Sequence, residues 1–433
     1  MRSLGARLSV PARGAVAGSL ASGLVGQLML LVSGVAVART LGPTDRGYLA
    51  LLVLLPAVLQ QVGTLGLPLS TTYFIAKDER DEPAVRRSLV APAVLQAVVL
   101  VALQGFLLYL LLDGQPGAMR DAAIVSLALL PGAIADMYGK ALLQGQGRYR
   151  AFNILRNATI AFYLAGLAAV WLVDAADIVG IMVAWVSANL LSGALTLIVA
   201  LHGRPPHAAE HAGVSRRRML EFGLLGLLGS LSPVATFRLD QAVVGLFLSA
   251  RELGLYVAGL AFTNLPVVIS RGVAMIALPE VARATPEKRQ AATRRFVWLA
   301  TALSSVVVAI LILAAGELVP LLFGPDFTEA VTITRILLIG AVFTGARRVL
   351  TDSVSGSGRP GLGSAVELVS WIVLVPLLLV LAPIWGTEGV AAALTVAAAI
   401  SFVVLVILVR RSDATGAPDE PDPLIIAESV TIE

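Results

Sequence analysis

Apolar runs of membrane-spanning length follow one another along the whole chain, separated by short polar segments. As a helix, a run of ~20 apolar residues crosses the ~30 Å hydrocarbon core of a bilayer. The pattern predicts an all-α polytopic membrane protein without a separate water-soluble domain. We expect twelve transmembrane helices, at 14–38, 47–76, 88–112, 122–144, 154–173, 178–201, 220–248, 253–281, 296–315, 333–354, 363–381 and 389–409.

Lysines and arginines gather in alternate loops. Of the 32 basic residues, 24 fall on the side that holds the N-terminus, 5 fall on the other side and 3 lie within spans. Because basic loop residues stay on the cytoplasmic side, we expect both termini in the cytoplasm. The expected location is a bacterial-type cytoplasmic (plasma) membrane, crossed many times.

The amino-acid composition limits the kinds of functional site that the chain can form. The 433 residues are 57% hydrophobic and 14% charged, against roughly 25% charged in a soluble domain. The absence of cysteine excludes disulfides, thiolate metal sites and cysteine nucleophiles. The net charge is +4, and the basic residues lie mostly in the loops. We therefore attribute these residues to the orientation of the protein in the membrane and expect no nucleic-acid binding. We also expect no cofactor and no metal.

The predicted span 220–248 carries charges well inside its apolar run, at Arg238 and Asp240. A charge at mid-bilayer costs ~2.5–3.5 kcal/mol on insertion scales, so such residues normally pair or face a cavity. Glycines recur at every third position from Gly223, and Pro233 sits near the centre, so a bend is expected. The pattern favours a flexible helix lining a polar path. The alternative is an Arg–Asp pair that only fixes packing.

Other polar side chains within spans are candidates for a cavity or for ion coupling. We expect Asp240 to pair with Arg238 or Arg271, because an isolated buried carboxylate would protonate. For Asp136 and Lys140, one helical turn apart, we favour a structural pair. The candidate substrate-binding residues are Arg271, Arg238, Asp240, Gln27, Gln60, Gln61 and Asn264, and the ion-coupling candidates are Asp240, Asp136 and Glu367.

Two pairs of loop segments resemble each other and reveal an internal repeat. Segment 41–48 (LGPTDRGY) matches 248–256 (LSARELGLY) at a displacement of 207. Segment 145–148 (GQGR) matches 356–359 (GSGR) at a displacement of 211. These loops follow equivalent spans in two halves of six. Because six is even, the halves run the same way and would be related by a pseudo-two-fold axis along the membrane normal.

The expected organisation is therefore an N-terminal six-helix lobe at 1–202, a cytoplasmic linker at 203–216 and a C-terminal six-helix lobe at 217–411. An acidic, proline-bearing tail at 412–433 is expected to be disordered. His207 and His211 lie four apart in the linker. Flanking prolines favour a flexible linker over a metal site there.

Several motifs carry a family resemblance. Segments 38–43 (ARTLGP) and 66–68 (GLP) resemble the opening signature of the polysaccharide transporter branch of the multidrug/oligosaccharidyl-lipid/polysaccharide flippases. Segments 142–148 (LLQGQGR) and 239–241 (LDQ) are similar to further stretches of it. The resemblance covers about residues 14–410. It implies two six-helix lobes and export of an oligosaccharide on a polyprenyl diphosphate carrier, with membrane lipids and polysaccharide assembly proteins as contacts.

The expected function is an alternating-access flippase that moves this carrier-linked oligosaccharide to the outer leaflet. Arginine's planar fork suits phosphate oxygens, and outward movement of an anion is downhill by ~2.3 kcal/mol per charge per 100 mV. One alternative is a cation-coupled drug or small-molecule exporter of the same superfamily, although residues 14–38 hold no carboxylate. Another is a membrane enzyme of polysaccharide assembly. Because the outer loops are short, we expect no enzymatic activity.

Overall fold

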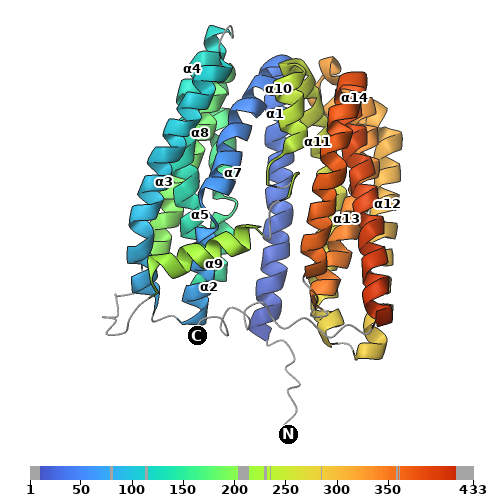
Figure 1. Ribbon diagram of the computed structural model, residues 1–433. Coiled ribbons are helices and arrows are strands. Elements are labelled where there is room, and N and C mark those ends of the chain that lie inside the picture. Colours follow the sequence, from blue (N-terminus) through green and yellow to red (C-terminus); the bar gives the residue numbers. More distant parts are fainter. Residues whose placement is uncertain are drawn as a thin grey trace. The chain divides into compact units, whose positions relative to one another are not determined.

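The computed structural model describes residues 10–78, 81–112, 116–202, 214–228, 232–234, 236–283, 285–356, 359 and 361–415. The regular structure of these residues is helical (Figure 1), as the apolar pattern predicts. Contacts divide the chain into two compact units. Unit 1 comprises 1–41 and 48–230, and unit 2 comprises 42–47 and 231–433.

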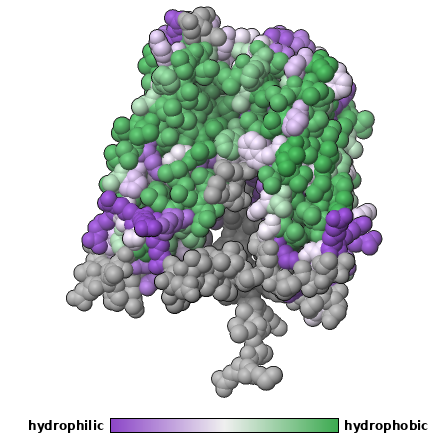
Figure 2. Space-filling view, in the orientation of Figure 1, coloured by the Kyte–Doolittle hydropathy of each residue, from purple (hydrophilic) through white to green (hydrophobic). Residues whose placement is uncertain are grey.

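Each unit is a bundle of helices. Unit 1 holds most of α1 (Val10–Gly63), then α2 (Leu67–Lys77), α3 (Glu82–Leu111), α4 (Gly117–Ser126), α5 (Leu129–Gly145), α6 (Tyr149–Leu155), α7 (Ala158–Leu172), α8 (Ile178–Leu201) and α9 (Arg216–Leu228). Unit 2 holds α10 (Leu239–Phe247), α11 (Ala250–Arg283), α12 (Pro286–Phe323), a short 3₁₀ turn (Pro325–Phe327), α13 (Ala330–Gly356) and α14 (Gly361–Thr415). In both units the surface seen in Figure 2 is hydrophobic along the middle of the helices and hydrophilic near their ends.

Within the described residues, nine helical stretches are long and apolar enough to cross a membrane. The stretch 361–412 contains two predicted spans, and the stretch 22–63 holds most of 14–38 and the first part of 47–76. In these two stretches the helix is interrupted only at Gly42 (φ 68°) and Gly386 (φ 56°), where glycine takes a left-handed conformation without a Cβ penalty. The remainder of 47–76 is α2, which follows a turn with Leu65 and Gly66 at positive φ, so this span is divided rather than one continuous helix. Together with α2, the nine stretches therefore account for eleven predicted spans.

The remaining predicted span, the seventh (220–248), is not the single bent helix that we expected. The helix α9 is described as far as Leu228 and α10 begins at Leu239. The described residues between them, 232–234 and 236–238, are irregular and include Pro233. Arg238 lies in the left-handed region (φ 46°) at the start of α10. Proline has no backbone N–H and clashes with the preceding turn, so Pro233 weakens a continuous helix at this point. Other prolines, such as Pro92 in α3, lie inside helices that continue.

The helix α9 packs against α2 within unit 1, and in Figure 1 it lies across the other helices of this unit. Phe222 stacks on Tyr73 with ring centroids 4.4 Å apart, and the Arg218 guanidinium lies 5.7 Å from the centre of the Phe74 ring. A Cβ on Gly223 would lie 2.8 Å from the carbonyl oxygen of Leu65. These contacts assign α9 to unit 1, whereas the sequence suggested that it opens the second lobe.

The ends of the predicted lobes are only partly described. Residues 203–213 of the expected linker, with His207 and His211, lie outside the described residues, as do 416–433 of the expected tail. Residues 412–415 form the last turn of α14. The tail therefore begins as helix rather than as the disordered segment that we expected from position 412.

Candidate functional site

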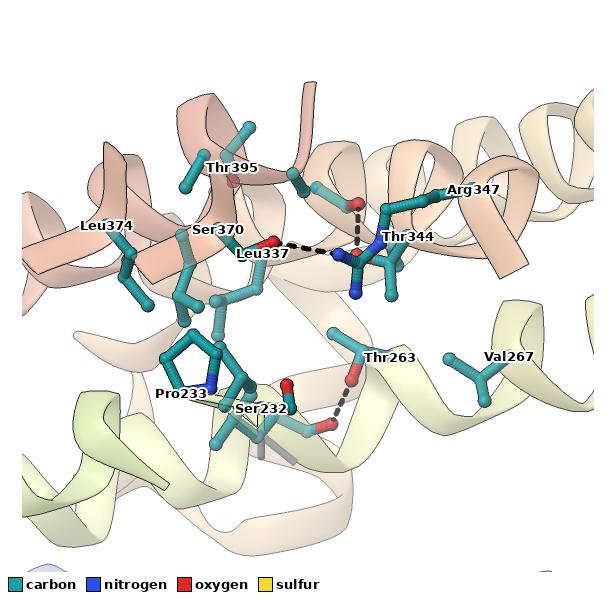
Figure 3. Close-up of a pocket in the computed structure, with 17 residues that line it drawn as sticks. Ser232, Pro233, Thr263, Val267, Leu337, Thr344, Arg347, Ser370, Leu374 and Thr395 are labelled. Atoms are coloured by element: carbon teal, nitrogen blue, oxygen red, sulfur yellow. Dashed lines mark hydrogen bonds between the residues drawn. The ribbon is translucent and has the colours of Figure 1, made fainter. Parts of the chain in front are cut away.

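A cavity of about 180 Å³ lies within unit 2 (Figure 3). Its walls come from α11, α13, α14 and the irregular segment 232–234 that precedes α10. Apolar side chains form much of the lining. The polar lining consists of Ser232, Thr263, Thr344, Arg347, Ser370 and Thr395. The break in the seventh span thus places Ser232 and Pro233 at a cavity wall.

Arg347 is the charged residue of this lining. Its Nη1 donates a hydrogen bond of 2.8 Å to Oγ of Ser370, and its Nη2 lies 3.2 Å from Oε1 of Glu367. The Arg347 and Glu367 side chains are 20% and 28% exposed. The other oxygen of Glu367, Oε2, is buried and accepts no hydrogen bond within the described chain. The Arg347 guanidinium is therefore held at the cavity, and the Glu367 carboxylate has one oxygen without a hydrogen bond.

Arg271 lies at the same level as Arg347. A Cβ on Gly259 of α11 would lie 3.2 Å from Oγ1 of Thr334 of α13, and a Cβ on Gly345 of α13 would overlap Oγ of Ser270 of α11. Both contacts join residues 75 apart, so the two helices run parallel in constant register. In that register Arg271 is level with position 346, beside Arg347.

Arg271 also continues the cavity-lining face of α11. Thr263 and Val267 line the cavity, and residues four apart share a helix face. Arg271 lies one turn beyond Val267 on this face, and its side chain is exposed. On α11, Arg271 thus lies one turn beyond the cavity lining, at the level of Arg347 on α13.

The structure gives Asp240 a different partner from the one that we expected. Its carboxylate is buried, and Oδ2 accepts a hydrogen bond of 3.0 Å from the Tyr256 hydroxyl. Its Oδ1 has no hydrogen bond within the described residues. Arg238 is exposed at the start of α10. The described structure therefore gives Asp240 a hydroxyl partner on α11, Tyr256. The ion pair with Arg238 or Arg271 that we expected stays a prediction.

The remaining candidate on α11 is Asn264. Its side chain is exposed, and its Nδ2 donates to the carbonyl oxygen of Ala261 at 3.2 Å. This hydrogen bond lies within its own helix turn and does not tie Asn264 to another helix.

In unit 1, Asp136 lies in a small polar cluster between α5, α7 and α8. Its Oδ1 accepts hydrogen bonds from Ser192 (3.2 Å) and Thr196 (2.9 Å), and its Oδ2 pairs with Lys140. Thr159 donates in turn to Ser192 at 2.9 Å. Three groups thus hold one half-buried carboxylate and a fourth supports one of them, an arrangement expected of the structural role that we favoured for the Asp136–Lys140 pair.

The three candidate glutamines of α1 differ in their surroundings. Gln60 donates from Nε2 to the carbonyl oxygen of Ala133 at 2.8 Å, which joins α1 to α5. Gln61 is exposed. Gln27 is half-buried, and its Oε1 is buried without a hydrogen bond in the described part of the chain. The Gln60 side chain therefore ties α1 to α5, whereas the side-chain amides of Gln27 and Gln61 are candidates for contact with another partner.

The structure thus pairs Arg347 with Glu367 at one cavity and places Arg271 at the level of Arg347 on α11. Asp136 and the glutamines lie in unit 1. The sequence did not suggest Arg347, because it counts among the basic residues near a span's cytoplasmic end. A signal was present: Gly340, Thr344 and Arg347 recur at helical spacing on one face of α13. Within the described residues, no three His, Asp or Glu side chains gather as metal ligands.

Comparison with known sequences decides the family. The family described as polysaccharide biosynthesis protein matches residues 36–332. The chain belongs to this family. A curated relative, the probable low-salt glycan biosynthesis flippase Agl15 of Haloferax volcanii, is 22% identical over 196 residues, which are 44% of this chain and 41% of the relative. The chain thus aligns with less than half of that relative's length.

Solved structures agree on the fold. An inward-facing multidrug resistance MATE family transporter of the MOP superfamily superposes with a TM-score of 0.71 at 17% identity, covering 93% of this chain and 98% of the other. The lipid II flippase MurJ, inward closed, gives 0.68 at 13% identity, covering 93% and 88%. A MOP superfamily transporter from Pyrococcus furiosus gives 0.63 at 17% identity, covering 92% and 94%. The protein is therefore a multi-pass membrane protein with the MOP transporter fold, and the expected fold class and branch are confirmed.

Proposed function

We propose that this polysaccharide biosynthesis family member is an alternating-access flippase for polyprenyl-diphosphate-linked oligosaccharide, which it moves from the inner to the outer leaflet. The observation that carries the proposal is Arg347, a cation that lines a hydroxyl-bearing cavity within unit 2. The similarity to a probable glycan biosynthesis flippase and to the lipid II flippase fold supports the same class of cargo.

Arg347 and Glu367 supply the chemistry of an exchangeable anion site. A diphosphate oxygen offers the guanidinium the same kind of acceptor as the Glu367 carboxylate, and arginine binds both in a bidentate fork. The cargo's diphosphate would replace Glu367 on Arg347, with Arg271 at the same level as a second cation. Hydroxyl groups of Thr263 and Thr344 lie along the cavity wall, where they could accept or donate hydrogen bonds to sugar.

The exchange also gives Glu367 a role in ion coupling. Once its arginine binds cargo, this half-buried carboxylate needs a proton or a cation to remain in place. Asp240 and Asp136 stay in the proposal as alternative coupling residues. They are held by Tyr256 and by the Ser192–Thr196–Lys140 cluster, so we place Glu367 first.

We also propose the membrane location of the protein and the boundaries of its two lobes. The two lobes, expected at 1–202 and 217–411 but with α9 (Arg216–Leu228) moved to the first by its packing on α2, would rock around the cargo in a bacterial-type cytoplasmic membrane, with both termini in the cytoplasm. Polysaccharide assembly proteins would receive the cargo at the outer face. No catalytic step on the sugar is proposed.

A cellular experiment tests the function. Cells that lack the gene should lose their surface glycan and accumulate the lipid-linked oligosaccharide at the inner face. Wild-type protein and Arg348→Gln should restore export, whereas Arg347→Gln should not. Arg348 is the matched control, because it is exposed, lies outside the cavity and pairs with Asp352. Unchanged lipid-linked intermediates in deleted cells, with altered drug sensitivity instead, would contradict the proposal and favour a drug exporter.

A further inference from the structure

A second concave site lies in unit 1, away from the charged groups described above. It is a groove of about 420 Å³ between α3 on one side and α5 and α8 on the other. Its lining is almost entirely apolar, and small residues such as Ala93, Ala97 and Ala135 leave the space open. The charged side chains that line it, Arg86 and Arg87, are both at one end.

The groove exists because α3 is held by polar contacts at separate points. Buried Gln96 accepts a hydrogen bond of 2.6 Å from the Tyr138 hydroxyl, and buried Gln104 donates to Oγ of Ser126 at 3.1 Å. Away from these bonds α3 exposes large apolar side chains, including Val90 (64%) and Val94 (59%). These two also border the groove, so its opening faces the surroundings of the bundle.

The length of the groove matches one leaflet of a bilayer. On α3 it extends from Arg86 to Ala97, which is about 16 Å at 1.5 Å per residue. Half of a ~30 Å hydrocarbon core is about 15 Å. An apolar groove of this length, with arginines at one end, has the dimensions of a single acyl chain below its head group.

The two arginines are not equivalent. Arg86 pairs with Glu82 and donates from Nη2 to the carbonyl oxygen of Ala200 at 2.9 Å, so it fixes the end of α8. Arg87 is exposed, and its Nε donates to the carbonyl oxygen of Pro83 at 3.2 Å. In the described structure its terminal nitrogens make no hydrogen bond. Arg87 therefore presents a cationic fork at the mouth of the groove.

We propose that this groove binds one acyl chain of an anionic glycerophospholipid whose phosphate is held by Arg87. Burial of the chain supplies affinity for any phospholipid, and the guanidinium supplies a charge-assisted hydrogen bond to the phosphate. A zwitterionic head group offsets this attraction with its own cation, so an anionic head group is preferred. A polyprenyl carrier is too long for a groove whose length matches a single leaflet.

The experiment measures lipid retention, which is independent of transport. Delipidated protein in a non-ionic detergent is titrated with dioleoyl phosphatidylglycerol or dioleoyl phosphatidylcholine, and bound lipid is counted by native mass spectrometry. Wild-type protein should bind one phosphatidylglycerol about tenfold more tightly than phosphatidylcholine, because the choline cation offsets the attraction of the phosphatidylcholine phosphate for Arg87. Arg87→Gln should abolish this preference. Ala97→Phe, which fills the groove, should weaken the binding of both lipids.

Two matched variants control for surface charge and for helix damage. Arg150→Gln removes an exposed arginine of α6 outside the groove, and Ala102→Phe adds a ring to the exposed face of α3; both should bind like wild type. Equal phosphatidylglycerol binding by wild type and Arg87→Gln would overturn the proposal. Displacement of phosphatidylglycerol from the groove by a polyprenyl diphosphate would also overturn it.

Discussion

Gly47 and Gly254, repeat-equivalent glycines 207 positions apart, pack against each other within unit 2. A Cβ on Gly47 would lie 3.0 Å from the amide nitrogen of Gly254 and would overlap the carbonyl oxygen of Ala250. A Cβ on Gly254 would lie 3.2 Å from the amide nitrogen of Gly47 and would overlap the carbonyl oxygen of Pro43. Pro43 and Ala250 are also 207 apart. Each segment thus offers equivalent atoms to the other, as in a self-complementary contact around a two-fold axis.

This contact predicts that neither glycine tolerates a side chain. Gly47→Ala and Gly254→Ala must force the two segments apart, because the obstructing atoms belong to the backbone. Such overpacking costs typically 1–3 kcal/mol, which should appear as a lower melting temperature in detergent. Gly272→Ala on the same helix as Gly254 is the control, since its Cβ would meet nothing within 4 Å. Equal melting temperatures for all three variants would contradict the packing described.

The Tyr256 hydroxyl is the hydrogen-bond donor to the buried Asp240 carboxylate. Tyr256→Phe leaves that carboxylate without its side-chain donor, and an unsatisfied buried polar group costs about 1–3 kcal/mol. We expect a lower melting temperature for Tyr256→Phe. Tyr109→Phe, at a residue that is 79% exposed, should melt like wild type. Restored stability in the double variant Asp240→Asn with Tyr256→Phe would show that the charge is what needs the hydroxyl.

Glu329 gives a prediction for pH. Arg251 donates to its two carboxylate oxygens at 2.5 and 3.0 Å, and these bonds lower the pKa of Glu329. A carboxyl with a lowered folded pKa adds stability above its unfolded value of ~4.3 and loses it as the pH falls through the lowered value. Because both side chains are exposed, the effect is small.

The measurement is the melting temperature of wild type and Glu329→Gln as a function of pH. The small difference should be present at neutral pH and should vanish on acidification. Arg251→Gln should reproduce it, and the double variant should add nothing. A difference that is unchanged across this range would exclude the ion pair as its cause.

The orientation in the membrane is tested by single cysteines, for which the cysteine-free chain is a ready background. Ser215, before α9, and Ala175, between α7 and α8, are both exposed. The distribution of lysine and arginine predicts that an impermeant thiol reagent modifies Ser215→Cys only from the cytoplasm and Ala175→Cys only from outside. Modification of both from the same side would contradict the predicted topology.

Much of the fold follows from the sequence, because length and apolar composition determine where a helix can cross a bilayer. The predicted span 178–201 coincides with α8. The repeat also has a structural counterpart: Arg148 donates to the carbonyl oxygen of Val199 at 2.7 Å near the end of α8, and Arg359 donates to Oγ of Ser412 at 2.9 Å near the end of α14. The equivalent arginines thus bind near the ends of the last helix in each half.

The seventh span shows where composition is insufficient. Its residues are apolar enough for one helix, but Pro233 interrupts the hydrogen-bond ladder and Tyr73 and Phe74 offer α9 an aromatic surface on α2. The contact with α2 joins residues about 150 positions apart, and no local pattern records it. The aromatic contact with α2, rather than hydropathy, places α9 in unit 1.

The candidate site was harder to predict for the same reason. Glu367 was identified as an acid within a span, yet its partner Arg347 lies on another helix. Arg271 was identified from its depth, but its level beside Arg347 depends on the parallel register of α11 and α13, which is set by Gly259 and Gly345. Distances between helices are decided by packing, so a single sequence indicates the residues without their pairing.

The central claim is that Arg347 binds the diphosphate of a translocated glycolipid, and vesicle reconstitution tests it directly. Vesicles carry a polyprenyl-diphosphate oligosaccharide in the inner leaflet, and an external glycosidase reports its arrival in the outer leaflet. Wild type and Arg348→Gln should expose the glycan at equal rates. Arg347→Gln, which loses a charge-assisted bidentate contact, should be slower by about tenfold or more, with Arg347→Lys between them. Wild-type rates no faster than those of protein-free vesicles, or a folded Arg347→Gln protein as fast as wild type, would contradict the account.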